Sequence, residues 1–155
     1  FMLDSSISEN IAFGRQLNRS NKDPIKIAAR KAKIHNFIEN NLENGYETII
    51  GDNGVKLSGG EKQRLVIARA LYDDPQIIIF DEATSSLDQK TEKEVMKEIK
   101  NFSKNKTLIM IAHRLNIVKD CDLIILLNNG SIEAKGTYEE LKNSNNSFSK
   151  MLKQK

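Results

Sequence analysis

The chain has 155 residues, of which 39% are hydrophobic and 29% are charged, as in an ordinary globular protein with one buried core. Its net charge is only +3, from 24 basic and 21 acidic side chains, which argues for neither nucleic acid nor a membrane surface as an electrostatic partner. The single cysteine excludes an internal disulfide and fits a reducing compartment. No apolar run in the sequence approaches the ~18 residues that a membrane-spanning helix needs, and no signal-peptide pattern is present.

The first part of the chain is predicted to be helical. Asp23 and Pro24 are typical of an N-cap and a first helical position. Apolar residues then recur at helical spacing over about five turns, namely Ile27, Ile34, Ile38 and Leu42. Gly45 ends this predicted helix. A second helix is expected from Ser58 through Leu71, where the Asp74-Pro75 pair stops it.

A different pattern begins after Pro75. Residues 76–80 (QIIIF) are apolar and β-branched, which predicts a strand buried on both faces of a parallel sheet. A polar connection over 84–88 leads to a helix over about 89–102, and residues 107–112 (TLIMIA) predict a second fully buried strand. A short helix near 115–119 precedes a third strand over 123–127. This alternation predicts a right-handed parallel α/β layer preceded by a separate helical lobe.

The last thirty residues are predicted to contain a hairpin and two short helices. Asn129-Gly130 is typical of a type I′ turn, with a return strand over 131–134. Helical segments are expected near 138–142 and 148–152.

Polar residues stand at the carboxyl ends of the predicted strands, where ligands gather in open parallel sheets. Asp81 and Glu82 follow the first strand, and His113 follows the second. The two carboxylates could be a helix-capping Asp with a solvated Glu. Alternatively, Asp81 could hold Mg²⁺ while Glu82 orients and deprotonates a water that attacks a γ-phosphate. His113 could contact the same phosphate or water, or be structural, and these residues alone leave both interpretations open.

The stretch from Leu57 to Glu61 is also unusual. Ser58 is a good N-cap, but Gly59 and Gly60 are poor residues for a helix start, each costing ~1 kcal/mol relative to Ala. They suit a backbone that must approach a ligand closely, and the N–H groups at a helix N-terminus form an anion site. The alternative is a simple glycine turn before a helix.

Four ordered motifs resemble those of the ATP-binding-cassette family. LSGGEKQRLVIARAL (57–71) resembles its signature, IIIFDEATSSLD (77–88) its Walker B strand, catalytic Glu and D-loop, IAHRL (111–115) its switch histidine, and NNGSIEAKGTYEEL (128–141) its closing hairpin. The resemblance implies an α/β fold with a P-loop NTPase-like parallel sheet and an inserted α-helical subdomain. Residues of about 15–73 would form that subdomain, and about 74–155 the C-terminal part of the core.

The resemblance also implies ATP and Mg²⁺ as cofactors and a role for each matching residue. Asp81 would serve Mg²⁺, Glu82 would be the general base, and His113 would contact the γ-phosphate. Asp88 would communicate across a dimer. The γ-phosphate of ATP held by the opposite subunit would bind to the signature residues Ser58, Gly59 and Gly60, with Glu61 at a position where the family has Gln or Glu.

The phosphate-binding loop of the family, G-x-x-x-x-G-K-[ST], does not occur in this sequence. The family's adenine-stacking aromatic residue and Q-loop Gln would precede Phe1. Because nothing else here cradles the β- and γ-phosphates, we expect the isolated chain to bind Mg-ATP very weakly and not to turn it over.

The segment SISENIAFG (6–14) resembles the exporter branch of the family. We therefore expect part of an ATPase that powers export, paired head to tail with a second nucleotide-binding domain and coupled to a transmembrane domain. Such a domain is soluble and lies on the cytoplasmic face of the membrane. Alternatives are a soluble cassette ATPase of DNA repair or translation, whose second cassette or long insertions are not seen here, and a non-catalytic interaction module. Neither these residues nor the resemblance defines the transported substrate.

Overall fold

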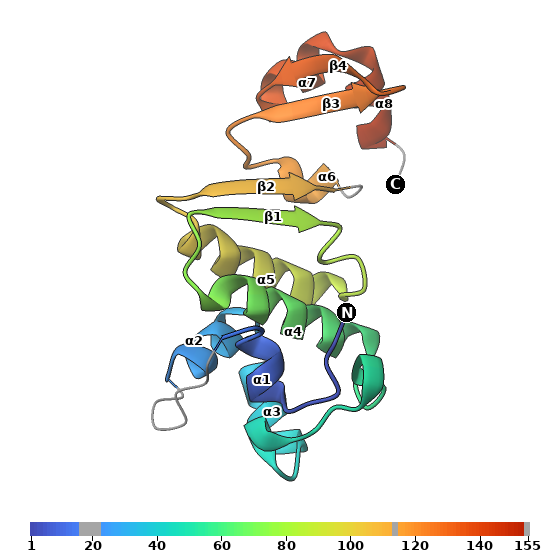
Figure 1. The fold of residues 1–155 in the computed structure, drawn as a ribbon. Helices are drawn as coiled ribbons and strands as arrows, with labels where there is room; N and C mark the ends of the chain where they lie inside the picture. The colour runs from blue at the N-terminus through green and yellow to red at the C-terminus, as the bar shows by residue number, and fades with distance from the viewer. Residues whose placement is uncertain (16–22, 113–114, 154–155) are drawn as a thin grey trace. The chain divides into compact units, whose positions relative to one another are not determined.

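A computed structural model of the chain describes residues 1–15, 23–112 and 115–153 (Figure 1). Two compact units are present, Phe1–Ile109 and Met110–Lys155. In chain order the elements are α1 (Ile7–Ile11), α2 (Asp23–Lys31), α3 (His35–Asn41), the 3₁₀ turns η1 (Gly45–Glu47) and η2 (Asp52–Gly54), α4 (Gly59–Tyr72), β1 (Ile77–Asp81), α5 (Gln89–Phe102), β2 (Thr107–Ile111), α6 (Leu115–Val118), β3 (Ile124–Asn128), β4 (Ser131–Gly136), α7 (Tyr138–Ser144) and α8 (Asn146–Lys153). None of the helices described is long and apolar enough to cross a membrane.

The first unit is built around α4, the predicted second helix, whose observed bounds confirm the prediction within a residue. α1 and α2 pack against it. Burying apolar side chains drives this packing at roughly 25 cal/mol per Å². The core of this helical part includes the buried residues Ile7, Ile11, Ile25, Ala29, Ile34, Ile38, Leu65, Ile67, Ala68 and Leu71.

The prediction of one five-turn helix from Asp23 to Gly45 is wrong. Two helices, α2 and α3, occupy this stretch, because Lys33 adopts a left-handed conformation with φ of 56°. The N–H of Lys33 donates to the carbonyl of Arg30, and the N–H of Ile34 donates to that of Ala29. This is the Schellman closure of a helix end, here with Lys in the position that Gly usually takes. Ile27 was predicted to belong to the buried apolar stripe, but it is 48% exposed.

The sheet of the first unit begins with β1, which is hydrogen-bonded to β2. Their arrows run in the same direction in Figure 1, with α5 as the connection, so the pair is a parallel α/β unit. Ile78 and Phe80 are buried, whereas Ile77 and Ile79 are 61% and 63% exposed. The prediction of two buried faces is therefore wrong, because strand side chains alternate and helices cover only one face of β1 among the described residues. Alternate residues of β2 are exposed too.

The second unit contains the predicted hairpin. β3 pairs with β4 antiparallel, and Asn128 stands opposite Ser131. Asn129 and Gly130 have φ of 49° and 76°, as a type I′ turn requires. We expected β3 to extend the parallel layer, but in the described part of the chain it belongs to a separate two-stranded sheet. The tight turn brings β4 alongside β3, and α7 and α8 add a small core with Leu141 and Phe148.

Candidate functional site

The start of α4 is a capping box. The Oγ of Ser58 accepts the N–H of Glu61 at 3.3 Å, and a carboxylate oxygen of Glu61 accepts the N–H of Ser58 at 2.7 Å. This exchange satisfies two backbone donors, so Glu61 has a structural partner within the chain. The N–H groups of Gly59 and Gly60 lie in the first turn, where a helix has no carbonyl four residues earlier to accept them. They therefore point out of the N-terminus of α4.

Asp81 ends β1 and Glu82 begins the loop that follows. Both side chains are exposed. Glu82 has φ of 48°, a left-handed conformation that costs a non-glycine residue about 1–2 kcal/mol. The loop then turns, because the N–H of Ser85 donates to the carbonyl of Glu82 at 3.0 Å. The strand therefore delivers two adjacent carboxylates to solvent at its carboxyl end.

The loop after Glu82 is anchored at both of its ends. Thr84 is buried and donates its hydroxyl to the buried carboxylate of Glu92 on α5, at 2.9 Å. Asp88 is the N-cap of α5, and its Oδ1 accepts the N–H groups of Lys90 and Thr91 at 3.0 Å each. These hydrogen bonds, those of Thr91 first, lower the pKa of Asp88 and hold it ionised.

The structure brings the start of α4 against this loop. A Cβ on Gly59 would lie 3.8 Å from the Cβ of Ser86, and one on Gly60 would lie 3.5 Å from the carbonyl oxygen of Ser86. The side chain of Gln63, which sequence reasoning overlooked, hydrogen-bonds Glu82, Ser85 and Ser86. Its place in the signature motif was the only sequence signal that could have drawn attention to it.

A second network ties the amino-terminal segment to the same helix. Arg69 donates to the carbonyl of Asn10 at 2.8 Å, to its side-chain oxygen at 3.0 Å, and to the carbonyl of Phe1 at 3.0 Å. The guanidinium also lies over the ring of Phe13, 4.5 Å from its centroid. Burial lowers the pKa of Arg69. α1 and α4 are thus joined by a part-buried polar contact.

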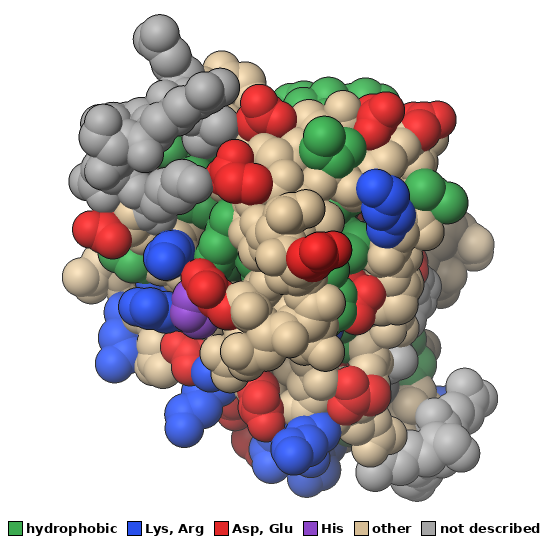
Figure 2. Space-filling view, turned by 90° about the horizontal axis from the view of Figure 1, so that it is seen from below, with side chains coloured by type: hydrophobic (Ala, Val, Ile, Leu, Met, Phe, Trp, Pro, Cys, Tyr) green, Lys and Arg blue, Asp and Glu red, His purple; other side chains and the backbone are tan. Residues whose placement is uncertain are grey.

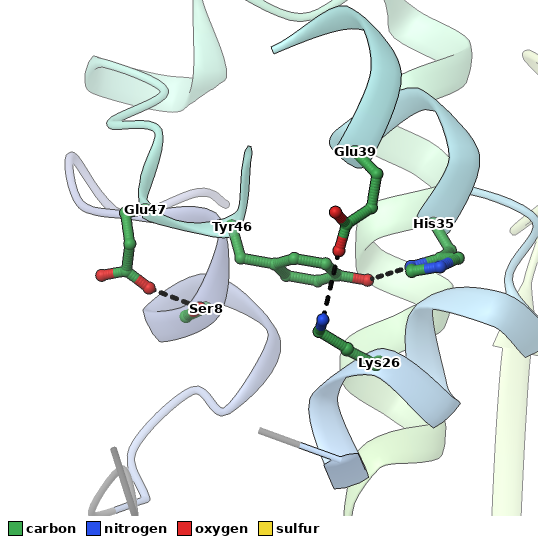
Figure 3. Close-up of polar contacts among 6 residues, drawn as sticks. All are labelled: Ser8, Lys26, His35, Glu39, Tyr46 and Glu47. Carbon is green, nitrogen blue, oxygen red and sulfur yellow. Dashed lines mark hydrogen bonds and ion pairs between the residues drawn. The ribbon is translucent and has the colours of Figure 1, made fainter. Parts of the chain in front are cut away.

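A polar cluster joins the helices farther from the site (Figure 3). His35 and the hydroxyl of Tyr46 share a hydrogen bond of 2.8 Å, and Lys26 pairs with Glu39 at 3.3 Å. Burial raises the pKa of Tyr46 to about 12. Burial also lowers the pKa of His35, helped by the charge of the nearby Arg30. In the view of Figure 2, acidic and basic side chains are mixed over the surface.

Two predicted features need separate mention. His113 lies outside the described residues. No group of three or more His, Cys, Asp and Glu side chains is arranged for a metal in the part of the chain that the structure describes. Asp81 and Glu82 nevertheless offer exposed carboxylate oxygens, the donors that Mg²⁺ prefers, and this ion commonly completes its shell with water and substrate phosphates.

The parallel β1–α5–β2 unit, with carboxylates at the strand end and a helical part before it, is an α/β fold of the P-loop NTPase type, as predicted. The sequence profile described as "ABC transporter" matches residues 3–85, more than half of the chain. The chain belongs to the ABC transporter family.

Relatives and a solved structure are similar over nearly the whole chain. ABC transporter B family member 1 of Dictyostelium discoideum is 48% identical over 90% of the chain, which spans 15% of that protein. The β-(1→2)glucan export ATP-binding/permease protein NdvA of Rhizobium johnstonii is 41% identical over 98% of the chain and 25% of its own length. A bacterial Atm1-family ABC exporter with ATP bound matches with a TM-score of 0.90 and 38% identity, covering 98% of this chain and 26% of that one. The chain thus spans between 15% and 26% of the length of these proteins.

Proposed function

We propose that the chain is part of the ATP-binding and ATP-hydrolysing domain of an ABC exporter, in which hydrolysis powers transport across a membrane. The observation that carries the proposal is the packing of the Ser58–Gly60 helix start against the loop that follows Asp81 and Glu82. The carboxylates of Asp81 and Glu82 and the start of a helix then belong to neighbouring segments of the first unit. The names of the relatives, which describe exporters, favour this role over a soluble ATPase of DNA repair or translation.

In this proposal Glu82 is the general base. Its exposed carboxylate polarises the water that attacks the γ-phosphate of ATP. Asp81 would hold Mg²⁺, which supplies charge neutralisation on the phosphates when bound. His113 would contact the γ-phosphate.

The start of α4 is the second half of the proposed site, and it would act on ATP bound to a second nucleotide-binding domain. The γ-phosphate of ATP held by a second nucleotide-binding domain would bind to the Ser58 hydroxyl and to the N–H groups at the start of α4. Glu61 lies beside this site, in the capping box with Ser58. Asp88, kept ionised by its capping bonds, would act across the same dimer. The partners are therefore a second such domain, head to tail, and a transmembrane domain, with the chain on the cytoplasmic face.

The exposed face of β1, with Ile77 and Ile79, is the surface that the remainder of such a domain would cover. That remainder would also supply the phosphate-binding loop. For this reason we expect turnover only in the full-length protein and not in the isolated chain.

The test is Mg-ATP hydrolysis by the full-length protein with Glu82→Gln, which keeps the shape of the side chain and removes the base. Loss of a general base should lower turnover by about 10²–10⁴-fold. The matched control is Glu94→Gln, an exposed carboxylate on α5, which should leave turnover unchanged. Wild-type turnover in Glu82→Gln would contradict the proposal.

A further inference from the structure

The side chain of Gln63 joins α4, the helix that carries the signature motif, to the loop that follows β1. Its Nε2 donates to the backbone carbonyl of Glu82 at 3.2 Å and to the hydroxyl of Ser85 at 3.4 Å. Its Oε1 accepts the backbone N–H of Ser86 at 2.9 Å. One amide therefore bonds to both sides of a single turn, using its donor and its acceptor at the same time.

Thr84 and Asp88 hold this loop on α5, and the Gln63 amide ties it to α4. Asp81, Glu82, Ser85 and Ser86 are exposed, so apolar packing holds them less than it holds Thr84 and Leu87, which are buried in the same loop. The left-handed conformation of Glu82 is moreover one that a non-glycine residue adopts only when its surroundings impose it. The Gln63 amide contacts the carbonyl of Glu82 itself, which is the peptide group that follows the strained torsions.

We propose that Gln63 is a positioning residue for hydrolysis, which fixes the backbone of Glu82 relative to the first turn of α4. This inference rests on the proposed role of Glu82 as the general base. A Cβ built on Gly59 or Gly60 would lie in contact distance of Ser86, so the start of the same helix is next to the loop that the Gln63 amide binds.

The amide is chemically specific for this task. A carboxylate of the same length could still accept the N–H of Ser86, but it has no hydrogen to donate and would repel the carbonyl of Glu82. A leucine of similar volume would make none of the three bonds. The matched variants are therefore Gln63→Glu and Gln63→Leu. Gln76→Leu serves as control, since Gln76 is an exposed glutamine before β1, at the other end of the strand.

The experiment measures kcat and KM for Mg-ATP, nucleotide affinity and Tm in the full-length protein. A misplaced catalytic group costs up to about 10²-fold, so both Gln63 variants should lose about tenfold or more in kcat. KM, nucleotide affinity and Tm should stay near wild type, and Gln76→Leu should match wild type throughout. If Gln63→Leu fails to fold, Gln63→Glu decides alone.

A second comparison separates positioning from a structural role. Because Gln63 acts through Glu82, Gln63→Leu should not lower further the residual single-turnover rate of Glu82→Gln. Wild-type kcat in the Gln63 variants, or loss of kcat only in step with Tm, would overturn the inference while Glu82→Gln stays inactive. Wild-type kcat in Glu82→Gln would overturn the proposed function instead.

Discussion

Arg69 and Asn10, fifty-nine positions apart, share two hydrogen bonds, one to the carbonyl of Asn10 at 2.8 Å and one to its side-chain oxygen at 3.0 Å. Asn10 is fully buried, and its amide nitrogen donates in turn to the carbonyls of Leu3 and Ser6 at 3.0 Å each. The amino-terminal segment thus folds around one buried amide that the signature helix holds in place.

The first prediction concerns this contact. Asn10→Ala should lower the unfolding free energy by about 2–4 kcal/mol, because one buried and several part-buried backbone groups lose their partner at once. Arg69→Met should cost a similar amount. Since the two residues serve one contact, the double variant should cost less than the sum of the single ones. Denaturant unfolding of the complete ATP-binding domain measures this, and full additivity would contradict the coupling.

The second prediction separates function from stability at Gly60. An Ala side chain there would make ordinary contacts, 3.5 Å from the Ser86 carbonyl and 3.7 Å from Leu87, and Ala favours a helix by up to ~1 kcal/mol. Gly60→Ala should therefore keep or raise Tm. ATP turnover should nevertheless fall in the full-length protein, because the methyl group blocks a phosphate from the helix start. A variant with normal turnover would show that the glycine serves no ligand.

Some of the fold could be predicted from local patterns. The bounds of α4 and α5 follow from their caps, Ser58 and Asp88, and the β3–β4 turn follows from Asn129-Gly130. The break between α2 and α3 could not be predicted, because Lys33 is an ordinary helix former and nothing in its sequence neighbourhood marks it for a left-handed conformation. Apolarity predicted β1 as a strand, yet it carries no information about which face other elements cover.

Some residues of the candidate site could likewise be predicted from the sequence, and one could not. Asp81, Glu82 and the Ser58–Gly60 turn stand out in the sequence because carboxylates after a strand and glycines at a helix start are costly without a purpose. Gln63 does not stand out, because its contacts with Glu82 and Ser86 join positions that are about twenty residues apart. Only the folded chain shows that they touch.

A third prediction concerns the buried pair that anchors the loop. Thr84→Val should lower the unfolding free energy by about 1–3 kcal/mol, since a buried carboxylate oxygen of Glu92 loses a donor at 2.9 Å. Thr84→Ser keeps the hydroxyl and should cost less. Thermal unfolding of the two variants checks this, and a larger loss in Thr84→Ser than in Thr84→Val would mean that the methyl group rather than the hydroxyl matters.

The fourth prediction is a pH dependence at His35. Burial, with Arg30 and Lys26 nearby, lowers the pKa of His35, while Glu39 opposes this shift. The unfolded chain then binds a proton more readily than the folded one, so stability is complete above the ordinary pKa of about 6.5 and is lost as pH falls through it.

Denaturant unfolding at pH 8 and pH 5.5 measures this loss. His35→Gln keeps a polar partner for Tyr46 but cannot titrate, so its stability should fall less than that of wild type over this interval. An equal fall in both proteins would assign the pH dependence to other groups.

The most direct test of the central claim is the identity of the nucleotide that the Glu82→Gln full-length protein retains after incubation with Mg-ATP. If Glu82 is the general base, the purified variant should hold uncleaved ATP, with two nucleotide-binding domains closed on it, while wild type releases ADP. Recovery of ADP from Glu82→Gln at the wild-type rate would contradict the account.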